Sequence, residues 1–139
     1  MLNLGILISG RGSNLKAIIK LSKEIPNEIK VVAVVSNNPD SLGVKISKNK
    51  KIPTEIFNHR EFSTREKFEK EIDNFFQRKK VNLICNAGFM RILTESFVNK
   101  WFNKIINIHP SLLPSSPGLN THSRAIKDGV KFTGCTVHF

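Results

Sequence analysis

The chain has 139 residues, of which 40% are hydrophobic and 24% charged, with 22 Lys and Arg, 11 Asp and Glu, and two cysteines. We expect one soluble globular domain over 1–139, because two cysteines cannot build a secreted disulfide framework. The longest apolar runs, such as 31–35, are far shorter than the roughly 18 residues of a membrane-spanning helix. We therefore expect a cytoplasmic protein with no membrane partner.

The net charge of +11 raises the question of a nucleic-acid partner. Such binding needs Lys and Arg gathered on one face, with aromatic side chains between them. Here the basic residues are scattered, and the one dense run, 45–51, lies on a predicted helix and its exit. We expect no nucleic-acid partner and interpret the charge as a solvated surface whose field attracts small anions.

Apolar runs and helical spacings alternate along the first part of the chain. Leu2 to Ile8 is an apolar run that ends in a glycine-rich turn, and the spacing after it predicts a helix from Asn14 to about Ile25. The run 31–35 lacks polar alternation, which is typical of a strand covered on both faces in a parallel sheet. The expected elements that follow are a strand over 30–36, a helix over 41–49 and a strand over 54–57.

The segment 63–66, Ser-Thr-Arg-Glu, predicts a helix start with a capping box made by Ser63 and Glu66. Apolar residues then recur at helical spacing, and the polar residues between them are expected on the other face. The apolar positions are Phe68, Ile72, Phe75 and Phe76, and the polar ones are Lys67, Glu69, Lys70 and Asp73. The elements expected afterwards are a strand over 81–86, a loop over 88–93, a helix over 94–102, a strand over 104–108, a loop over 110–118, a helix over about 121–128 and a strand over 133–139.

This alternation predicts an α/β fold: an open, mostly parallel twisted sheet with helices on both faces, wound in the dinucleotide-binding manner. Ligands of such sheets bind outside the carboxyl ends of the strands. Three motifs fall there, at 9–14, 86–93 and 107–110. We therefore expect the functional site at this edge.

The turn 9–14, Ser-Gly-Arg-Gly-Ser-Asn, places backbone N–H groups at a helix start, where a phosphate is favoured. Gly10 and Gly12 let the chain turn tightly. The pattern lacks the third glycine of the dinucleotide fingerprint and the Lys-Ser/Thr of a nucleotide-binding loop. A plain strand-to-helix turn is therefore the alternative.

Asn107 and His109 lie two apart at a predicted strand end, so an extended backbone points both side chains the same way. An amide N–H and an imidazolium together can stabilise an oxyanion, and the imidazole can move a proton near neutral pH. The alternative is a capping Asn and a hydrogen-bonded structural His. The spacing of His109, His122 and His138 is irregular and no acidic or Cys cluster accompanies them, so we expect no metal; Cys85 and Cys135 are expected to be non-catalytic.

Taken together, four segments resemble the phosphoribosylglycinamide formyltransferase family of folate-dependent formyl enzymes. They are 8–15 (Ile-Ser-Gly-Arg-Gly-Ser-Asn-Leu), 86–93 (Asn-Ala-Gly-Phe-Met-Arg-Ile-Leu), 107–114 (Asn-Ile-His-Pro-Ser-Leu-Leu-Pro) and 117–122 (Pro-Gly-Leu-Asn-Thr-His). The third is shared with methionyl-tRNA formyltransferase and formyltetrahydrofolate deformylase. The first and last point to the purine enzymes.

The resemblance implies formyl transfer from 10-formyltetrahydrofolate to the amine of 5-phosphoribosylglycinamide, with no metal. It implies that Gly12, Ser13 and Asn14 hold the substrate phosphate. It implies a folate pocket made by Met90, Arg91, Ile92 and Leu93, with Arg65 on the acidic tail of the folate. It implies that Asn107 binds the formyl oxygen and that His109 is the general acid, with His122 and His138 in support.

The family assists its catalytic His with an Asp that falls beyond Phe139, so the resemblance also implies a C-terminally incomplete fold. Two alternatives stay open for the activity. One is a fragment that binds phosphate or folate without catalysis, and the other is a related enzyme such as methionyl-tRNA formyltransferase. A homodimer is the candidate assembly.

Overall fold

The computed structural model describes residues 1–109 and 136–138, and they form a six-stranded sheet in the order β3-β2-β1-β4-β5-β6. The strands are β1 (Leu2–Ile8), β2 (Ile29–Ser36), β3 (Thr54–Ile56), β4 (Leu83–Asn86), β5 (Ile105–His109) and β6 (Thr136–His138). The helices are α1 (Ser13–Glu24), α2 (Leu42–Asn49), the short 3₁₀ helix η1 (His59–Glu61), α3 (Arg65–Arg78) and α4 (Glu95–Lys100).

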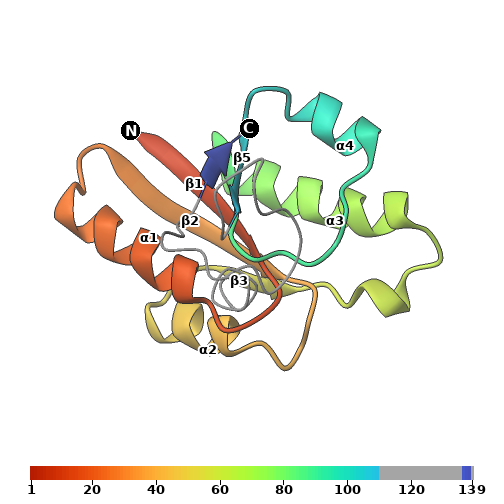
Figure 1. Ribbon diagram of the computed structural model, residues 1–139, viewed down its shortest axis with the longest axis horizontal. Coiled ribbons are helices and arrows are strands. Elements are labelled where there is room, and N and C mark those ends of the chain that lie inside the picture. Colours follow the sequence, from red (N-terminus) through yellow and green to blue (C-terminus); the bar gives the residue numbers. More distant parts are fainter. Residues whose placement is uncertain (110–135, 139) are drawn as a thin grey trace, which may run out of the picture.

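Strands β1 to β5 are parallel, and β6 pairs antiparallel with β5 (Figure 1). The predicted fold class, an open and mostly parallel sheet, is confirmed. The chain proceeds outward from β1 to β3 and then returns to build β4 and β5 on the other side of β1. The reversal between β1 and β4 is the point at which such sheets bind ligands. The predicted loop 110–118 and helix 121–128 lie outside the described residues.

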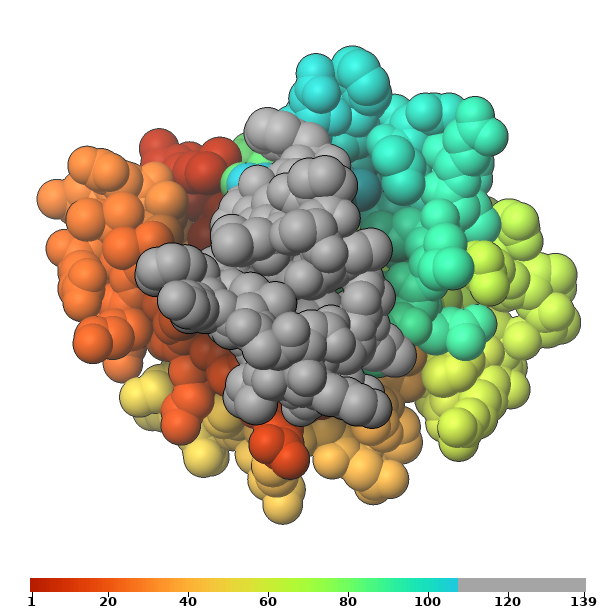
Figure 2. All heavy atoms as spheres, in the orientation of Figure 1, coloured from red at the N-terminus to blue at the C-terminus, as the bar shows by residue number. Residues whose placement is uncertain are grey.

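The sheet is covered on both faces by helices that differ in their core residues (Figure 1). In the space-filling view, the orange residues of α1 and the teal residues of α4 lie on opposite sides of the molecule (Figure 2). Helix α1 packs on one face through Leu15 and Ile19, with Ile46 of α2 beside them. On the other face α3 contributes phenylalanines and α4 contributes Phe97. Because β2 is sandwiched between these layers, its apolar run needs no polar alternation.

Helix α3 starts one residue later than the capping-box prediction requires. Its N-cap is Thr64, whose hydroxyl accepts the N–H of Lys67 at 3.2 Å. The predicted reciprocal pair of Ser63 and Glu66 is wrong, because the position three residues after this cap is a lysine, which has no acceptor. The apolar residues of α3 are buried as predicted: Phe68, Ile72, Phe75 and Phe76.

Two acidic residues expected on the solvent face of α3 are buried under α4. Glu69 is 4% exposed and accepts the N–H of Thr94 at 2.7 Å. Asp73 is 5% exposed and accepts from Trp101 Nε1 at 2.9 Å and Lys100 Nζ at 2.5 Å. These bonds fix the helix that follows the functional loop. Within the part of the chain that the structure describes, no helix is long and apolar enough to cross a membrane.

Candidate functional site

Three strands present polar residues at one level of the carboxyl edge. The register places Leu7 of β1 beside Asn86 of β4, and Asn86 beside Asn107 of β5. On the other side of β1, Ile8 pairs with Ser36. The loops after β1, β2 and β4 therefore meet at this edge; those after β1 and β4 carry predicted motifs, and the one after β2 does not.

The turn after β1 requires glycine at Gly12 for two reasons. Its φ of 77° lies in the left-handed region, and an added Cβ would stand 2.8 Å from the Cα of Gly43 in α2. The start of α2 also holds the turn, because Ser41 Oγ and Gly43 N both donate to the carbonyl of Gly10, at 2.6 and 3.1 Å. The turn is thus pinned against a second helix.

Helix α1 opens with free backbone donors. Gly12 is its N-cap, no side chain among the described residues caps it, and its first turn carries no acidic residue. The N–H groups of a first helical turn lack acceptors within the helix, and the helix dipole favours an anion beside them. Arg11 and Ser13 are exposed at this point. The structure thus leaves the positions predicted for phosphate, Gly12, Ser13 and Asn14, at an uncapped helix start.

The loop after β4 is anchored at one residue and exposed at the next. Asn86 Oδ1 accepts the N–H of Phe89 at 3.2 Å, and the Phe89 ring stacks on Phe68 with 6.3 Å between centroids. Met90 and Ile92 are 57% and 77% exposed. A loop fixed by a buried ring, with apolar neighbours in solvent, can cover a flat organic ligand.

A chain of hydrogen bonds joins this loop to the segments that follow β1, β2 and β3. Met90 N donates to Ser9 Oγ at 2.8 Å, Ser9 Oγ donates to Asn37 Oδ1, and Asn37 Nδ2 lies 3.2 Å from His59 Nδ1. Ser9 and Asn37 are buried, and Asn38 Nδ2 donates to the carbonyl of Ser9 at 3.2 Å. We call Met90, Ser9, Asn37 and His59 the relay.

The direction of each bond in the relay follows from its first donor. A backbone N–H can only donate, so the Ser9 hydroxyl accepts from Met90 and must donate to the Asn37 oxygen. The Asn37 amide nitrogen then donates to Nδ1 of His59, which is an acceptor only in a neutral ring protonated on Nε2. Partial burial, followed by the positive charge of Arg91, holds the pKa of His59 below its ordinary 6.5, which favours this neutral form.

Two cavities meet at His59. One, of about 260 Å³, is lined by relay residues together with Asn38 and Arg60. The other, of about 200 Å³, is lined by Phe62, Phe68, Arg65 and Arg91. We call the second the arginine pocket.

Arg91 of the arginine pocket has a buried side-chain nitrogen, Nε, without a hydrogen-bond partner among the described residues. Arg65 stands exposed on the rim at the start of α3. Two guanidinium groups in one pocket suit a carboxylate, which each can bind with two parallel N–H groups.

Asn107 and His109 both belong to β5, and their backbones pair with His138 and Thr136 of β6. Asn107 is half-buried beside Asn86. The side chains of His109 and His138, and all of His122, lie outside what the structure describes, so the predicted oxyanion pair stays a prediction. Leu93, the last residue of the predicted folate pocket, is half-buried against the core on the α3 face.

The remaining reactive side chains give no second centre among the described residues. No three His, Cys, Asp or Glu side chains there are placed to share a metal ion. Burial raises the pKa of the Cys85 thiol to about 11, so it is protonated at neutral pH, as expected for a core residue. Cys135 lies outside the described part.

Ser9, Asn37 and His59 line the site, although no sequence pattern predicts a role for these side chains. One signal for them exists: Asn37 directly follows β2, at the edge where ligands bind. The segment 37–40, Asn-Asn-Pro-Asp, is in itself typical of a strand end. His59 follows β3 at the same edge and carries no motif.

Comparison with known proteins agrees with these features. The family profile described as Formyl transferase matches residues 2–139. Phosphoribosylglycinamide formyltransferase of Haemophilus influenzae is 43% identical over 141 residues, which cover 100% of this chain and 66% of that protein. The trifunctional purine biosynthetic protein adenosine-3 of Gallus gallus is 46% identical over 134 residues, which cover 96% of this chain and 13% of that protein.

The solved structure of phosphoribosylglycinamide formyltransferase from Coxiella burnetii, in complex with CHES, is 43% identical with a TM-score of 0.93 over 99% of this chain and 65% of that one. The Brucella melitensis structure has a TM-score of 0.94 at 38% identity, over 99% of this chain and 72% of that one. The chain thus spans about two thirds of the length of these bacterial relatives and 13% of the trifunctional protein. By its profile match over 2–139, the chain belongs to the formyl transferase family.

Proposed function

We propose that the protein transfers a formyl group from 10-formyltetrahydrofolate to the amine of 5-phosphoribosylglycinamide, a step of purine biosynthesis. The observation that carries the proposal is that two places suited to an anion lie at the same edge of the sheet. An uncapped helix start lies beside β1, and an arginine pocket lies beyond the loop after β4. The two substrates carry matching groups: 5-phosphoribosylglycinamide has a phosphate, and the acidic tail of the folate has carboxylates.

The phosphate is assigned to Gly12, Ser13 and Asn14. Backbone N–H groups at a helix start bind a dianion without help from a basic side chain. The left-handed Gly12 and its contact with Gly43 support this assignment, because they hold the first turn in place before a ligand arrives.

The folate is assigned to the loop Met90, Arg91, Ile92 and Leu93, with the pterin on backbone groups. Arg65 and Arg91 take the carboxylates of the acidic tail. The buried, unpartnered Nε of Arg91 supports this assignment, because a carboxylate oxygen would satisfy it.

The reaction is assigned to Asn107 and His109. The substrate amine attacks the formyl carbon and forms a C–N bond, which places negative charge on the formyl oxygen. Asn107 donates its amide N–H to that oxygen, and His109 donates a proton to the oxyanion. Collapse then breaks the bond from carbon to N10 of the folate, which leaves with a proton from the amine. As the C=O bond forms again, the oxygen returns its proton to His109.

A formyl-transfer assay with both substrates tests the proposal. We expect Asn107→Ala and His109→Ala each to lower kcat by about 100-fold or more with little change in KM, because the removed contacts strengthen as the oxyanion forms. Asn99→Ala, at an exposed position of α4, is the control and should keep normal turnover.

Three other outcomes would contradict the proposal. Near-normal turnover of either variant would remove that residue from the mechanism. Saturable binding of the phosphate ester without turnover of the unaltered protein would favour the non-catalytic alternative. Transfer to methionyl-tRNA, and not to the ribonucleotide, would favour the related enzyme.

Three further expectations belong to this proposal: a single domain over 1–139, a cytoplasmic location and a homodimer. They rest on composition and on the family resemblance. Sedimentation analysis of the protein tests the assembly.

A further inference from the structure

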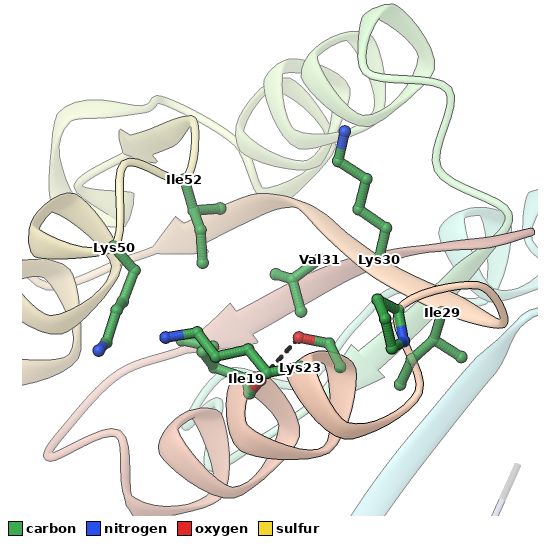
Figure 3. A pocket seen from close by; sticks show the side chains of 9 residues that line it. Ile19, Lys23, Ile29, Lys30, Val31, Lys50 and Ile52 are labelled. Carbon is green, nitrogen blue, oxygen red and sulfur yellow. Dashed lines mark hydrogen bonds between the residues drawn. The ribbon is translucent and has the colours of Figure 1, made fainter.

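A groove lies between α1, α2 and the start of β2 (Figure 3). It consists of two adjoining cavities of about 340 and 320 Å³ that share Ile19, Lys23 and Lys50. Both volumes fall at the lower end of the range for small-ligand pockets, roughly 300–1,000 Å³. We call this site the lysine groove.

The floor of the lysine groove is apolar. Side chains from all three elements and from the segment that leads to β3 compose it: Ile19, Ile29, Val31, Ile46 and Ile52. In Figure 3, Ile19, Val31 and Ile52 face the space between the helices. The hydroxyl of Ser22 is already used, because it donates to the carbonyl of Ile19 at 2.6 Å.

Among the residues that the structure describes, the rim of the lysine groove carries five lysines and no acidic residue: Lys16, Lys20, Lys23, Lys30 and Lys50. The first three lie at i, i+4 and i+7 on α1, so they form one stripe of about 10 Å. Lys23 belongs to α1 and Lys50 is the C-cap of α2, and their side chains point toward one another, whereas Lys30 points away (Figure 3). The nearby Lys50 ammonium lowers the pKa of Lys23, as expected of two cations held close together.

Paired cations beside an apolar floor select the chemistry of a ligand. An inorganic anion would leave the floor unused, and a neutral apolar molecule would leave the lysines unpaired. A nucleic acid is disfavoured because the described residues that line the groove include no aromatic side chain to stack on bases. Charge complementarity and volume together favour a small molecule that is both anionic and apolar.

We propose that the lysine groove binds a small organic anion, in which a carboxylate or phosphate lies between Lys23 and Lys50 and a compact apolar body packs on Ile19, Val31 and Ile52. The cavity lined by Ile29 and Val31 is separate from the formyl-transfer site, because it lies at the opposite end of β2 from Ser36. The second cavity extends along α1 toward Gly12, since its Ile46 lies close to that glycine.

Calorimetric titration of the protein with octanoate, octan-1-ol and acetate tests the proposal. We expect saturable binding of octanoate and much weaker binding of the other two probes, which each lack one of the required features. The double variant Lys23→Gln/Lys50→Gln should bind octanoate about tenfold more weakly, as expected for the loss of two exposed ion pairs. Lys48→Gln, on α2 outside the groove, is the matched control and should change affinity less than twofold.

Chemical-shift mapping of the labelled protein identifies the site of binding. We expect octanoate to shift amide signals of α1, α2 and the start of β2. Shifts confined to residues 59–93 would place the anion in the arginine pocket and overturn the proposal. Equal binding of octanoate and octan-1-ol, or equal binding by the double variant and Lys48→Gln, would also overturn it.

Discussion

Replacing Ser9 with alanine tests whether the relay positions the folate loop. Ser9 is 7% exposed, accepts the N–H of Met90 at 2.8 Å and donates to Asn37. The variant removes one oxygen and leaves both neighbours without this partner. The loop then keeps its anchor at Phe89 but loses the bond that holds the next residue.

The expected cost follows from where the two neighbours lie. Met90 is 57% exposed, so water can replace Ser9 as the acceptor for its N–H. Asn37 is 4% exposed, so its oxygen stays without a donor, at a cost of about 1–3 kcal/mol. We expect a loss of about 2 kcal/mol in the free energy of unfolding and a several-fold rise in KM for the folate, with KM for the phosphorylated substrate little changed.

Ser47→Ala is the matched control. Ser47 is fully buried in α2 and bonds to the carbonyl of Val44 at 3.0 Å and to Thr54 Oγ1 at 2.8 Å. Urea unfolding should therefore show a similar loss of stability, whereas the folate KM should not change. If Ser9→Ala destabilises the protein but leaves the folate KM normal, or if Ser47→Ala raises that KM equally, the relay does not position the loop.

Three other predictions follow from single backbone or charge features. The pKa of His59 is below 6.5, so its neutral form contributes stability that is present above pH 6.5 and lost as the pH falls through the folded pKa. The urea midpoint of His59→Gln should therefore change less between pH 7 and pH 5 than that of the unaltered protein. An equal change in the two proteins would refute this. Gly12→Ala should lower the free energy of unfolding by about 1–2 kcal/mol and weaken the binding of the phosphorylated substrate, as measured by calorimetry. Gly88→Ala is the control, because Gly88 has φ of 80° but open space around it; this variant should strain the backbone and leave the binding of that substrate unchanged. Lys80, which follows α3, has φ of 57°, so Lys80→Gly should raise the free energy of unfolding by about 0.5–1 kcal/mol, because glycine adopts this left-handed backbone without strain. Lys79 has φ of −87°, so an equal gain from Lys79→Gly would contradict this explanation.

The secondary structure was largely predictable because its signals are local. The unbroken apolar run of β2 and the spacing of Phe68, Ile72 and Phe76 in α3 each determine which element forms. What such patterns cannot supply is the packing partner of a polar residue. Glu69 and Asp73 look like solvent-facing positions until α4 covers them, and the residues that do so follow about 25–28 positions later.

The candidate site, too, has a part that local patterns predict and a part that depends on contacts between distant segments. Its loops could be predicted, since the carboxyl ends of parallel strands meet at one edge. The relay could not be predicted, because Ser9 and Met90 are 81 positions apart and Asn37 and His59 are 22 apart. No spacing rule connects a serine, an asparagine and a histidine over such distances.

The distribution of positive charge shows why scattering along a chain differs from scattering in space. Lysines that look dispersed in the sequence gather around one groove, since helical spacing brings Lys16, Lys20 and Lys23 into a stripe and α2 adds Lys50. Their ammonium groups are exposed and hydrated, so binding there needs an apolar contribution from the ligand. Arg91 is the opposite case, because its Nε is already buried and a carboxylate can bind it without first removing water. Ligand discrimination therefore depends on the burial of each cation as well as on the net charge of +11.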